Sequence, residues 1–278
     1  MNPADLVRRS SAYLEAHGVE SPRATAEALL MHVLRTDRTG LYARTEGLDA
    51  ATARVFGRAL CQRCAGAPVQ YLTGEQPFMD LSLAVTPGVF VPRPETEVVV
   101  EVGLGVIEGT TTPLVVDVGT GTGAIALAIK RRRPEARVIG TDVSEAALKL
   151  AAQNAARHGL DVELHSGDLL SSLPASLRGR LHLVVSNPPY VTAQEYDALP
   201  REVKAEPYEA LVGGTNVHTR LVEVAPGWLA PGGWLVVEIG ADQGETVRAL
   251  FEERLQDVQV LPDLAGRDRV VRGRAPTR

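Results

Sequence analysis

The residues best suited to chemistry end and follow a mostly apolar run, residues 181–187, that predicts a buried strand. They are Asn187, Pro188, Pro189 and Tyr190. A primary amide or aromatic amine nitrogen is a poor nucleophile because its lone pair is delocalised, so a methyl donor reacts with it only once that pair is freed and aimed. Two acceptors opposite its N–H bonds would do this. The Asn187 side-chain oxygen and the Pro188 carbonyl are suitable, because proline restricts its own backbone and that of the preceding residue.

Tyr190 would offer a flat face to the same planar group. Such a site acts mainly through orientation and preorganised electrostatics. No general base is needed before transfer, because methylation itself makes the proton on the nitrogen acidic. The alternative is that these residues form only a rigid turn. The pattern favours a catalytic site for methyl transfer to planar nitrogen.

A glycine-rich loop supplies a second candidate site, at the carboxyl end of the predicted strand 113–119. Glycines let backbone approach a ligand closely, and the helix that follows presents free N–H groups to it. Asp142 lies 23 residues after the first glycine, at the end of the next predicted strand, where a carboxylate can hold both hydroxyls of an adenosine ribose. The loop residues expected to bind cofactor are Gly119, Thr120, Gly121, Thr122 and Gly123.

Three further side chains indicate which cofactor this loop holds. The glycine spacing, with Ala124, also fits a dinucleotide loop, and a tight turn without ligand is another alternative. Asp117, however, would repel a pyrophosphate and suits an ammonium group. Asp168 offers an acceptor for an adenine amino group, with Leu169 and Ile125 for the apolar faces, although Asp168 alone could equally belong to a surface loop. S-adenosylmethionine carries an ammonium, a ribose and an adenine in this arrangement and is the expected cofactor.

The elements that must position these residues fall into three segments. Residues 1–68 have helical spacing and predict a small helical bundle, in which the Ser21-Pro22 pair is typical of an N-cap and first helical position. Over residues 69–92 the spacing of apolar residues is no longer helical, which predicts a linker or hairpin. Residues 93–278 alternate apolar strands with amphipathic helices, which predicts an α/β domain with a parallel, doubly wound, Rossmann-like sheet.

Composition limits the alternatives. The 278 residues carry 29 basic and 34 acidic side chains, a formal net charge of −5 that argues against a duplex nucleic-acid binder. No stretch approaches the roughly 18 apolar residues of a membrane span, and the first residues lack the apolar core of a secretion signal, so we expect a cytoplasmic protein without membrane contact. Cys61 and Cys64 have no further ligands nearby, and the histidines lack ligand spacing, so no metal is expected.

Several longer segments resemble one family. The Asn-Pro-Pro-Tyr segment with this fold is similar to methyltransferases of planar nitrogen, both DNA adenine-N6 and protein glutamine-N5 enzymes. Four others resemble the HemK/PrmC family, the glutamine methyltransferases of peptide chain release factors, and the similarity runs from about residue 74 to 274. These segments are GVFVPRPETE (88–97), EPYEALVGG (206–214), LAPGGWLVVEIG (229–240) and DLAGRDRVVRGR (263–274).

The resemblance implies methyl transfer from S-adenosylmethionine to the glutamine side-chain nitrogen in the Gly-Gly-Gln loop of a release factor, which would modulate translation termination. The helical domain would bind this protein substrate, and we expect a monomer. Asn187 to Tyr190 would hold the glutamine, Asn187 would also touch the cofactor, and Phe90 would wall the site where methyl and amide meet. Arg93 and Glu95 would fix the segment that carries Phe90.

One departure from the family and four alternatives stay open. The family usually continues Gly-Gly-x-Asp-Gly after residues 206–211, whereas this chain has Asn216 and Val217 in the last two places, which puts the cap of the next helix in doubt. A ribosomal-protein glutamine methyltransferase is the nearest alternative. A DNA adenine methyltransferase would need a basic domain that the charge count does not supply. An oxidoreductase would leave Asn187 to Tyr190 unexplained, and a noncatalytic binding module is the last alternative.

Overall fold

The computed structural model describes residues 2–277 and divides into two compact units. Unit 1 holds the chain up to Glu75 together with Leu199–Ala205, and unit 2 holds Gln76–Ala198 and Glu206–Arg278. The short stretch around residue 200 thus groups with the helical unit, and the assignment of separate roles to the predicted segments stays a prediction. No helix among the described residues is both long and apolar enough to cross a membrane.

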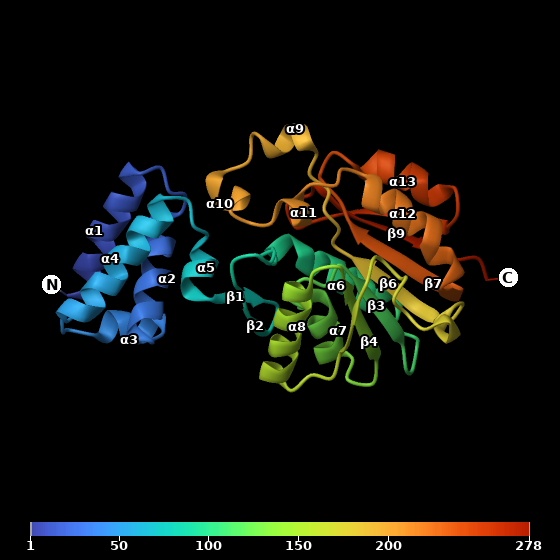
Figure 1. Ribbon diagram of the computed structural model, residues 1–278, viewed down its shortest axis with the longest axis horizontal. Coiled ribbons are helices and arrows are strands. Elements are labelled where there is room, and N and C mark those ends of the chain that lie inside the picture. The colour runs from blue at the N-terminus through green and yellow to red at the C-terminus, as the bar shows by residue number, and fades with distance from the viewer. Residues whose placement is uncertain (1, 278) are drawn as a thin grey trace. The chain divides into compact units, whose positions relative to one another are not determined.

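Unit 1 is helical, as its spacing predicts (Figure 1; blue to cyan, with α10 in orange). Leu29 and Leu30 of its second helix are fully buried in a core completed by Val7, Leu41 and Phe56. Sequence spacing predicts three of the helices. The others are too short to show a period. The helices are α1 (Pro3–Ala16), α2 (Pro22–Leu34), α3 (Arg38–Ala43), α4 (Ala50–Cys64), α5 (Val69–Thr73) and α10 (Arg201–Lys204).

Unit 2 is built on a seven-stranded sheet with the order β5-β4-β3-β6-β7-β9-β8 (Figure 1). The first five strands in this order are parallel, and β9 is antiparallel to both its neighbours. The sheet is therefore mixed rather than purely parallel. The strands are β3 (Leu114–Val118), β4 (Arg137–Asp142), β5 (Glu163–Ser166), β6 (Leu181–Ser186), β7 (Leu229–Glu238), β8 (Gln256–Pro262) and β9 (Asp268–Arg274).

The reason for the antiparallel edge is the length of its connection. Only five residues, 263–267, join β8 to β9, and a parallel pair needs a crossover of a dozen residues or more. A short loop can only join antiparallel neighbours. A separate two-stranded sheet is formed by β1 (Glu75–Phe78) and β2 (Leu81–Ala84), where sequence predicts a linker or hairpin.

Helices cover both faces of the large sheet, because residues along a strand point alternately to its two sides. Val115 and Val185 pack into one core with α6 and α7, while Val116 and Val184 pack into a second core with α12 and α13. The helices of unit 2 are α6 (Glu97–Val106), α7 (Ala124–Arg132), α8 (Glu145–His158), α9 (Ala193–Tyr196), α11 (Tyr208–Leu211), α12 (Asn216–Val224) and α13 (Gly244–Glu252), with short 3-10 turns η1 (Pro94–Thr96), η2 (Ala175–Leu177) and η3 (Ala225–Gly227).

Candidate active site

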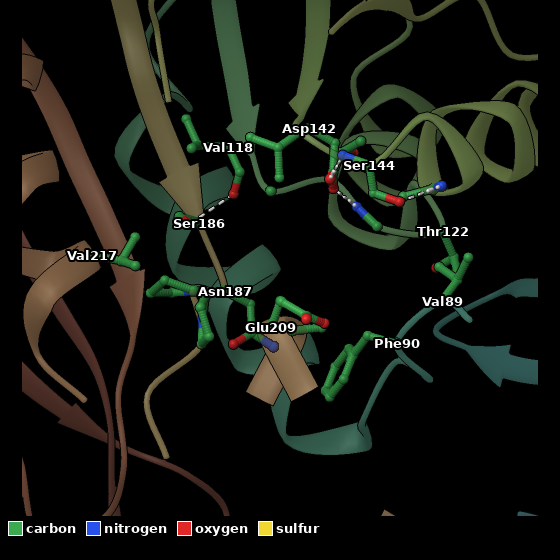
Figure 2. A pocket seen from close by; sticks show the side chains of 18 of the residues that line it. Val89, Phe90, Val118, Thr122, Asp142, Ser144, Ser186, Asn187, Glu209 and Val217 are labelled. Carbon is green, nitrogen blue, oxygen red and sulfur yellow. Dashed lines mark hydrogen bonds between the residues drawn. The ribbon is translucent and has the colours of Figure 1, made fainter. Parts of the chain in front are cut away.

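The loops that follow β3, β4 and β6 surround one cavity of about 560 Å³ in unit 2. In a sheet of this kind the carboxyl ends of the parallel strands meet at one edge and open a crevice for ligand. Asp142 and Ser144 line one part of this cavity, and Phe90, Glu209 and Asn187 gather at another (Figure 2). The structure thus brings the two candidate sites of the sequence together.

The glycine loop between β3 and α7 needs its glycines for conformation. Gly119, Gly121 and Gly123 have φ of 71°, 56° and 85°, a region that side chains with a Cβ rarely adopt. Gly119 and Gly121 line the cavity with Thr120 and Thr122, and nothing lies within 4 Å of a Cβ built on either glycine. The loop can therefore let a ligand approach its backbone closely.

Gly123 serves packing instead. It is not among the residues that line the cavity, and a Cβ built on it would lie 3.1 Å from Leu127 and 3.3 Å from Ala151. This close approach lets α7 begin directly against α8. These distances do not test the predicted contact of Gly123 with the cofactor, which stays a prediction.

Asp142 lines the cavity at the end of β4, as its position in the sequence predicts. Its Oδ2 accepts a hydrogen bond of 2.9 Å from the Gly121 amide, and its Oδ1 accepts one of 2.8 Å from the Ser144 amide. Ser144 in turn caps α8 by accepting from the Ala147 amide at 3.2 Å. A carboxylate has further lone pairs beyond these two bonds, so Asp142 can still accept from ligand hydroxyls.

Asp117 lies beneath the loop rather than in the cavity. It is fully buried and is not among the lining residues. Its Oδ2 accepts from the Thr120 hydroxyl at 2.6 Å and from the Ala126 amide at 3.1 Å, which ties β3 to the loop and to α7. Burial raises its pKa to about 7, against the effect of those two bonds. The geometry gives Asp117 a role in holding the loop, and its expected contact with an ammonium group stays a prediction.

Asp168 and Leu169 line the cavity after β5, together with two residues that sequence reasoning did not select. Arg220 of α12 forms an ion pair with Asp168, and Val217 lies three residues earlier on the same helix. Residues three apart share a helix face, so both reach the cavity. Val217 is one of the two residues at which the chain departs from the family pattern. Thr215, the N-cap residue of α12, makes no side-chain hydrogen bond to that helix.

Asn187, Pro188 and Pro189 also line the cavity. The Asn187 side-chain nitrogen donates to the Thr96 hydroxyl at 3.0 Å, across 91 residues of sequence. This bond leaves the amide oxygen of Asn187 available as an acceptor. Pro189 is approached closely by the 206–214 segment, because a Cβ on Gly213 would come within 2.3 Å of the Pro189 carbonyl oxygen.

Tyr190 is directed away from the lining set and into the unit. Its hydroxyl donates to Glu238 Oε1 at 3.3 Å, and its carbonyl accepts from Gln243 at 2.8 Å. Burial and the nearby Glu238 charge raise the pKa of the Tyr190 phenol well above its usual range. Tyr190 anchors the segment in this geometry, and its predicted stacking against substrate is not tested by the arrangement.

The segment that carries Phe90 is fixed by one buried carboxylate. Phe90 lines the cavity, and the guanidinium of Arg93 lies 5.1 Å from the centre of its ring. Arg93 pairs with Glu206, which also accepts from the Val91 amide at 2.9 Å. Arg93 therefore lies where it can fix the segment that carries Phe90, as we expect from the sequence. Glu206, which sequence reasoning did not single out, supplies its partner.

Thr96 and Glu238 complete the surroundings of Asn187. Thr96 is 3% exposed and Glu238 is 1% exposed. Burial raises the pKa of the Glu238 carboxyl to about 7, although hydrogen bonding from Thr96 and the charge of Arg269 oppose that shift. No pattern in the sequence could have paired Thr96 with Asn187, because their contact depends on how η1 docks on the sheet.

The residues that line the cavity suit S-adenosylmethionine. It has backbone of the glycine loop and the Asp142 carboxylate on one side, and apolar Ile125, Leu169 and Val217 among its remaining walls. Within residues 2–277 no group of three or more histidine, cysteine or carboxylate side chains could hold a metal ion. The arrangement is suited to bringing a ribose-bearing cofactor and a planar nitrogen side by side.

Comparison with known proteins decides the family. Residues 5–74 match the PrmC N-terminal domain, and residues 81–214 match the methyltransferase small domain. The chain is 46% identical over 274 residues to the release factor glutamine methyltransferase of Moorella thermoacetica, covering 95% of this chain and 94% of that protein. It is 41% identical to the one of Xylella fastidiosa strain 9a5c, covering 95% and 98%.

The chain belongs to the release factor glutamine methyltransferase family.

As a member of this family it is an S-adenosylmethionine-dependent methyltransferase. A solved structure of a T. thermophilus 16S rRNA N2 G1207 methyltransferase, with AdoMet and guanosine, resembles it with a TM-score of 0.55 and 21% identity, over 72% of this chain and 49% of that chain. This likeness shows the fold alone. A Rossmann-like methyltransferase unit with a helical N-terminal unit is the architecture that the sequence predicts.

Proposed function

We propose that this chain transfers a methyl group to the side-chain nitrogen N5 of the glutamine in the Gly-Gly-Gln motif of peptide chain release factors, and so modulates translation termination. The observation that carries the proposal is the Asn187 amide, which is held by Thr96 beside the same cavity that the glycine loop and Asp142 line. Near full-length similarity to release factor glutamine methyltransferases supports the choice of substrate.

The proposed chemistry depends on two acceptors. The Asn187 side-chain oxygen and the Pro188 carbonyl each accept one N–H of the glutamine amide, which holds the amide plane so that the nitrogen lone pair points into the cavity. Bound S-adenosylmethionine supplies the methyl group from its sulfonium centre. The nitrogen–methyl bond forms as the sulfur–methyl bond breaks, its electron pair stays on sulfur, and the cationic amide then loses a proton to water. Positioning supplies most of the rate enhancement in such a site.

The remaining residues divide between the two ligands. Gly119, Thr120, Gly121 and Thr122 are proposed to hold the cofactor with their backbone, and Asp142 to hold its ribose hydroxyls. Asp168 and Leu169 are proposed to face the adenine, and Phe90 to wall the point where methyl and amide meet. The support for these roles is their shared lining of one cavity.

Unit 1 is proposed to bind the release factor protein. The match of residues 5–74 to the PrmC N-terminal domain supports this division of labour. The net charge of −5 supports a protein substrate without direct contact to nucleic acid. We further propose that the enzyme works as a monomer in the cytoplasm, where release factors meet the ribosome.

The proposal is tested by labelled methyl transfer. The full chain is incubated with methyl-labelled S-adenosylmethionine and, in separate reactions, with a release factor, the same factor with its motif glutamine replaced by asparagine, ribosomal proteins, and duplex DNA. Label on the first substrate alone, located on glutamine N5 by mass spectrometry, is expected. Label on a ribosomal protein or on DNA, with none on the release factor, would overturn the proposal in favour of that substrate.

A further inference from the structure

Asn154 of α8 is a fully buried side chain to which the proposed chemistry gives no part. It is 0% exposed and is not among the residues that line the cavity. A buried amide costs free energy unless its oxygen and nitrogen find hydrogen-bond partners. The structure gives Asn154 three such partners, all of them backbone groups, on two segments that both lead to the candidate active site.

The first of these segments is the end of β2 and the residues after it. Asn154 Oδ1 accepts from the Ala84 amide at 2.7 Å, and Asn154 Nδ2 donates to the Ala84 carbonyl at 3.1 Å. Ala84 is the last residue of β2, and Phe90 follows on the same stretch and lines the cavity. Between them Val89 packs against Ala147 of α8. The Phe90 segment, residues 84–90, is therefore held on α8.

The second segment is the glycine loop, residues 119–123. Asn154 Nδ2 also donates to the Thr122 carbonyl at 2.9 Å, across 32 residues of sequence. The nitrogen of the same peptide group, the Gly123 amide, donates to the Thr120 carbonyl at 2.8 Å. The peptide between Thr122 and Gly123 is thus held at both ends, and its carbonyl oxygen stays directed at Asn154. Without Asn154 this oxygen would lose its partner, at a cost in free energy.

The Thr122 side chain connects this constraint to the cavity. Thr122 lines the cavity and is 2% exposed, yet its hydroxyl has no hydrogen-bond partner within residues 2–277. A buried hydroxyl without a partner costs free energy, which a ligand in the cavity recovers by bonding to it. Because the carbonyl and the side chain of Thr122 branch from the same Cα atom, holding the carbonyl restricts the direction of the hydroxyl.

We propose that Asn154 is a positioning residue that sets the separation between the glycine loop and the Phe90 segment. Its single planar amide bonds both, so neither segment can shift alone without breaking a buried hydrogen bond. The inference rests on the proposed function, because it takes the glycine loop as the cofactor site and Phe90 as the wall of the substrate site. Asn154 itself touches neither ligand and acts through backbone groups.

The rate of methyl transfer depends on this separation. The glutamine nitrogen must lie in line with the bond from the methyl carbon to sulfur, at a near-attack distance of roughly 3–3.5 Å. A misplacement of about 1 Å can lower a rate by about 10²-fold, even when its cause lies far from the reacting atoms. Loss of Asn154 should therefore lower kcat at saturating substrates by more than it weakens the binding of either ligand.

The chain offers a matched control on the same helix. His158 lies one turn after Asn154 on α8, and its Nε2 donates to the Ser82 carbonyl of β2 at 2.8 Å. This bond holds β2 on α8, as the bonds from Asn154 to Ala84 do, but it does not reach the glycine loop. Comparing His158→Leu with a change at Asn154 therefore isolates the contribution of the bond to the loop.

Two variants remove that bond. Asn154→Leu replaces the amide by an apolar group of similar size, and Asn154→Asp, when ionised, keeps the acceptor for the Ala84 amide but removes both donors. For each we expect kcat per folded molecule, at saturating substrates, to fall at least about tenfold. The S-adenosylhomocysteine Kd and the release-factor KM should rise by less than about fivefold. His158→Leu should keep its kcat within about threefold of the wild type.

A second measurement needs no variant and no turnover. Nuclear Overhauser contacts from the Asn154 side-chain N–H protons to protons of Ala84 and Thr122 are recorded in the labelled wild-type chain. We expect both sets of contacts in the free chain and with S-adenosylhomocysteine bound. Loss of the contacts to Thr122 on binding would overturn the inference, because the bond would be absent in the state that reacts. This readout decides the matter even if both Asn154 variants fail to fold.

A purely structural role for Asn154 predicts a different result. It would lower the folded fraction, which circular dichroism measures at the assay temperature, and leave the rate per folded molecule equal to that of His158→Leu. That outcome would overturn the positioning role while the wild type still transfers the methyl. If the wild type places no methyl on the release factor, the proposed function is wrong instead, and the nuclear Overhauser contacts decide whether Asn154 joins the two segments.

Discussion

At the residue scale, the account centres on one amide, that of Asn187. The sequence predicts its position at the crevice from two patterns, the apolar strand that precedes it and the prolines that follow. The structure places it among the lining residues. Its partner Thr96 could not be predicted, because 91 residues separate the two and only the docking of η1 brings them together.

Replacing Asn187 by alanine tests its assigned role. Loss of one acceptor from a preorganised site should lower kcat by about 10²- to 10³-fold. The cofactor Kd should change by less than about threefold, because Asp142 and the glycine loop remain. Single-turnover transfer and calorimetric titration measure the two quantities. An active variant, or one that fails only because it no longer binds cofactor, would refute the role.

Replacing Asp142 should have the opposite effect to replacing Asn187: it should weaken cofactor binding more than it lowers the rate. Asp142→Asn keeps the size of the side chain but replaces an acceptor oxygen by a donor, so it disturbs the bond from the Gly121 amide, 2.9 Å long, and the grip on ribose hydroxyls. We expect the cofactor Kd to rise by at least about tenfold, in line with the worth of a charge-assisted hydrogen bond. The rate at saturating cofactor should fall much less. If Asn187→Ala and Asp142→Asn weakened cofactor binding equally, the assignment of Asn187 to the substrate and Asp142 to the cofactor would be wrong.

Two residues show what sequence reasoning leaves open, namely the direction of a side chain. Asp117 and Tyr190 have the expected positions along the chain, but their side chains face inward, toward Thr120 and Glu238. Position along a strand tells which end of the sheet a residue occupies. For Asp117 on β3 it does not tell which face the side chain takes, since fully buried strands show no alternation, and Tyr190 lies beyond the end of β6, where no strand pattern applies.

At the element scale, the parallel strands and their helices could be predicted because each is long and regular enough to show a period. The antiparallel edge could not, because β8, the outermost strand, and β9, which pairs it to β7, are both rich in polar residues and show no clear apolar run. The sequence predicted where one helix begins but not how that end is capped. Helix α2 begins at Pro22 as expected, but Ser21 has φ of 48° and makes no capping bond.

The segment that carries Phe90 depends on the Arg93–Glu206 pair, in which the Glu206 side chain is 1% exposed. Arg93→Ala leaves this carboxylate buried with less compensation, so we expect the free energy of unfolding to fall by about 2 kcal/mol, less than for a fully buried pair because Arg93 is partly solvated. The release-factor KM should rise as the Phe90 wall loosens. Urea denaturation and steady-state kinetics measure the two effects.

The matched control is Arg131→Ala, which removes the half-exposed pair of Arg131 with Asp80 in the same unit. Exposed pairs contribute about 0.5 kcal/mol or less, so this variant should have nearly the stability of the wild type. Equal stability of both variants would show that Glu206 does not depend on Arg93.

At the scale of the whole molecule, two buried carboxyls link the site to stability. Asp117 and Glu238 both have a pKa raised to about 7 by burial, so the folded chain holds more protons than the unfolded chain between pH 4 and 7. Stability should therefore fall as pH rises through this range, by up to about 1.4 kcal/mol for each pH unit and each group. Urea denaturation as a function of pH should show the decline.

Asp117→Asn should make this decline shallower, since one titrating group is removed. The result would be contradicted if the pH dependence of unfolding were unchanged in this variant.

The measurement that tests the central claim most directly is a crystal structure of the full chain with S-adenosylhomocysteine and a release-factor Gly-Gly-Gln peptide. The account predicts the glutamine side-chain nitrogen at about 3 Å from both the Asn187 amide oxygen and the Pro188 carbonyl oxygen, with its plane turned toward the sulfur. A glutamine nitrogen held by other groups, or an Asn187 amide that turns its nitrogen to the substrate, would contradict it.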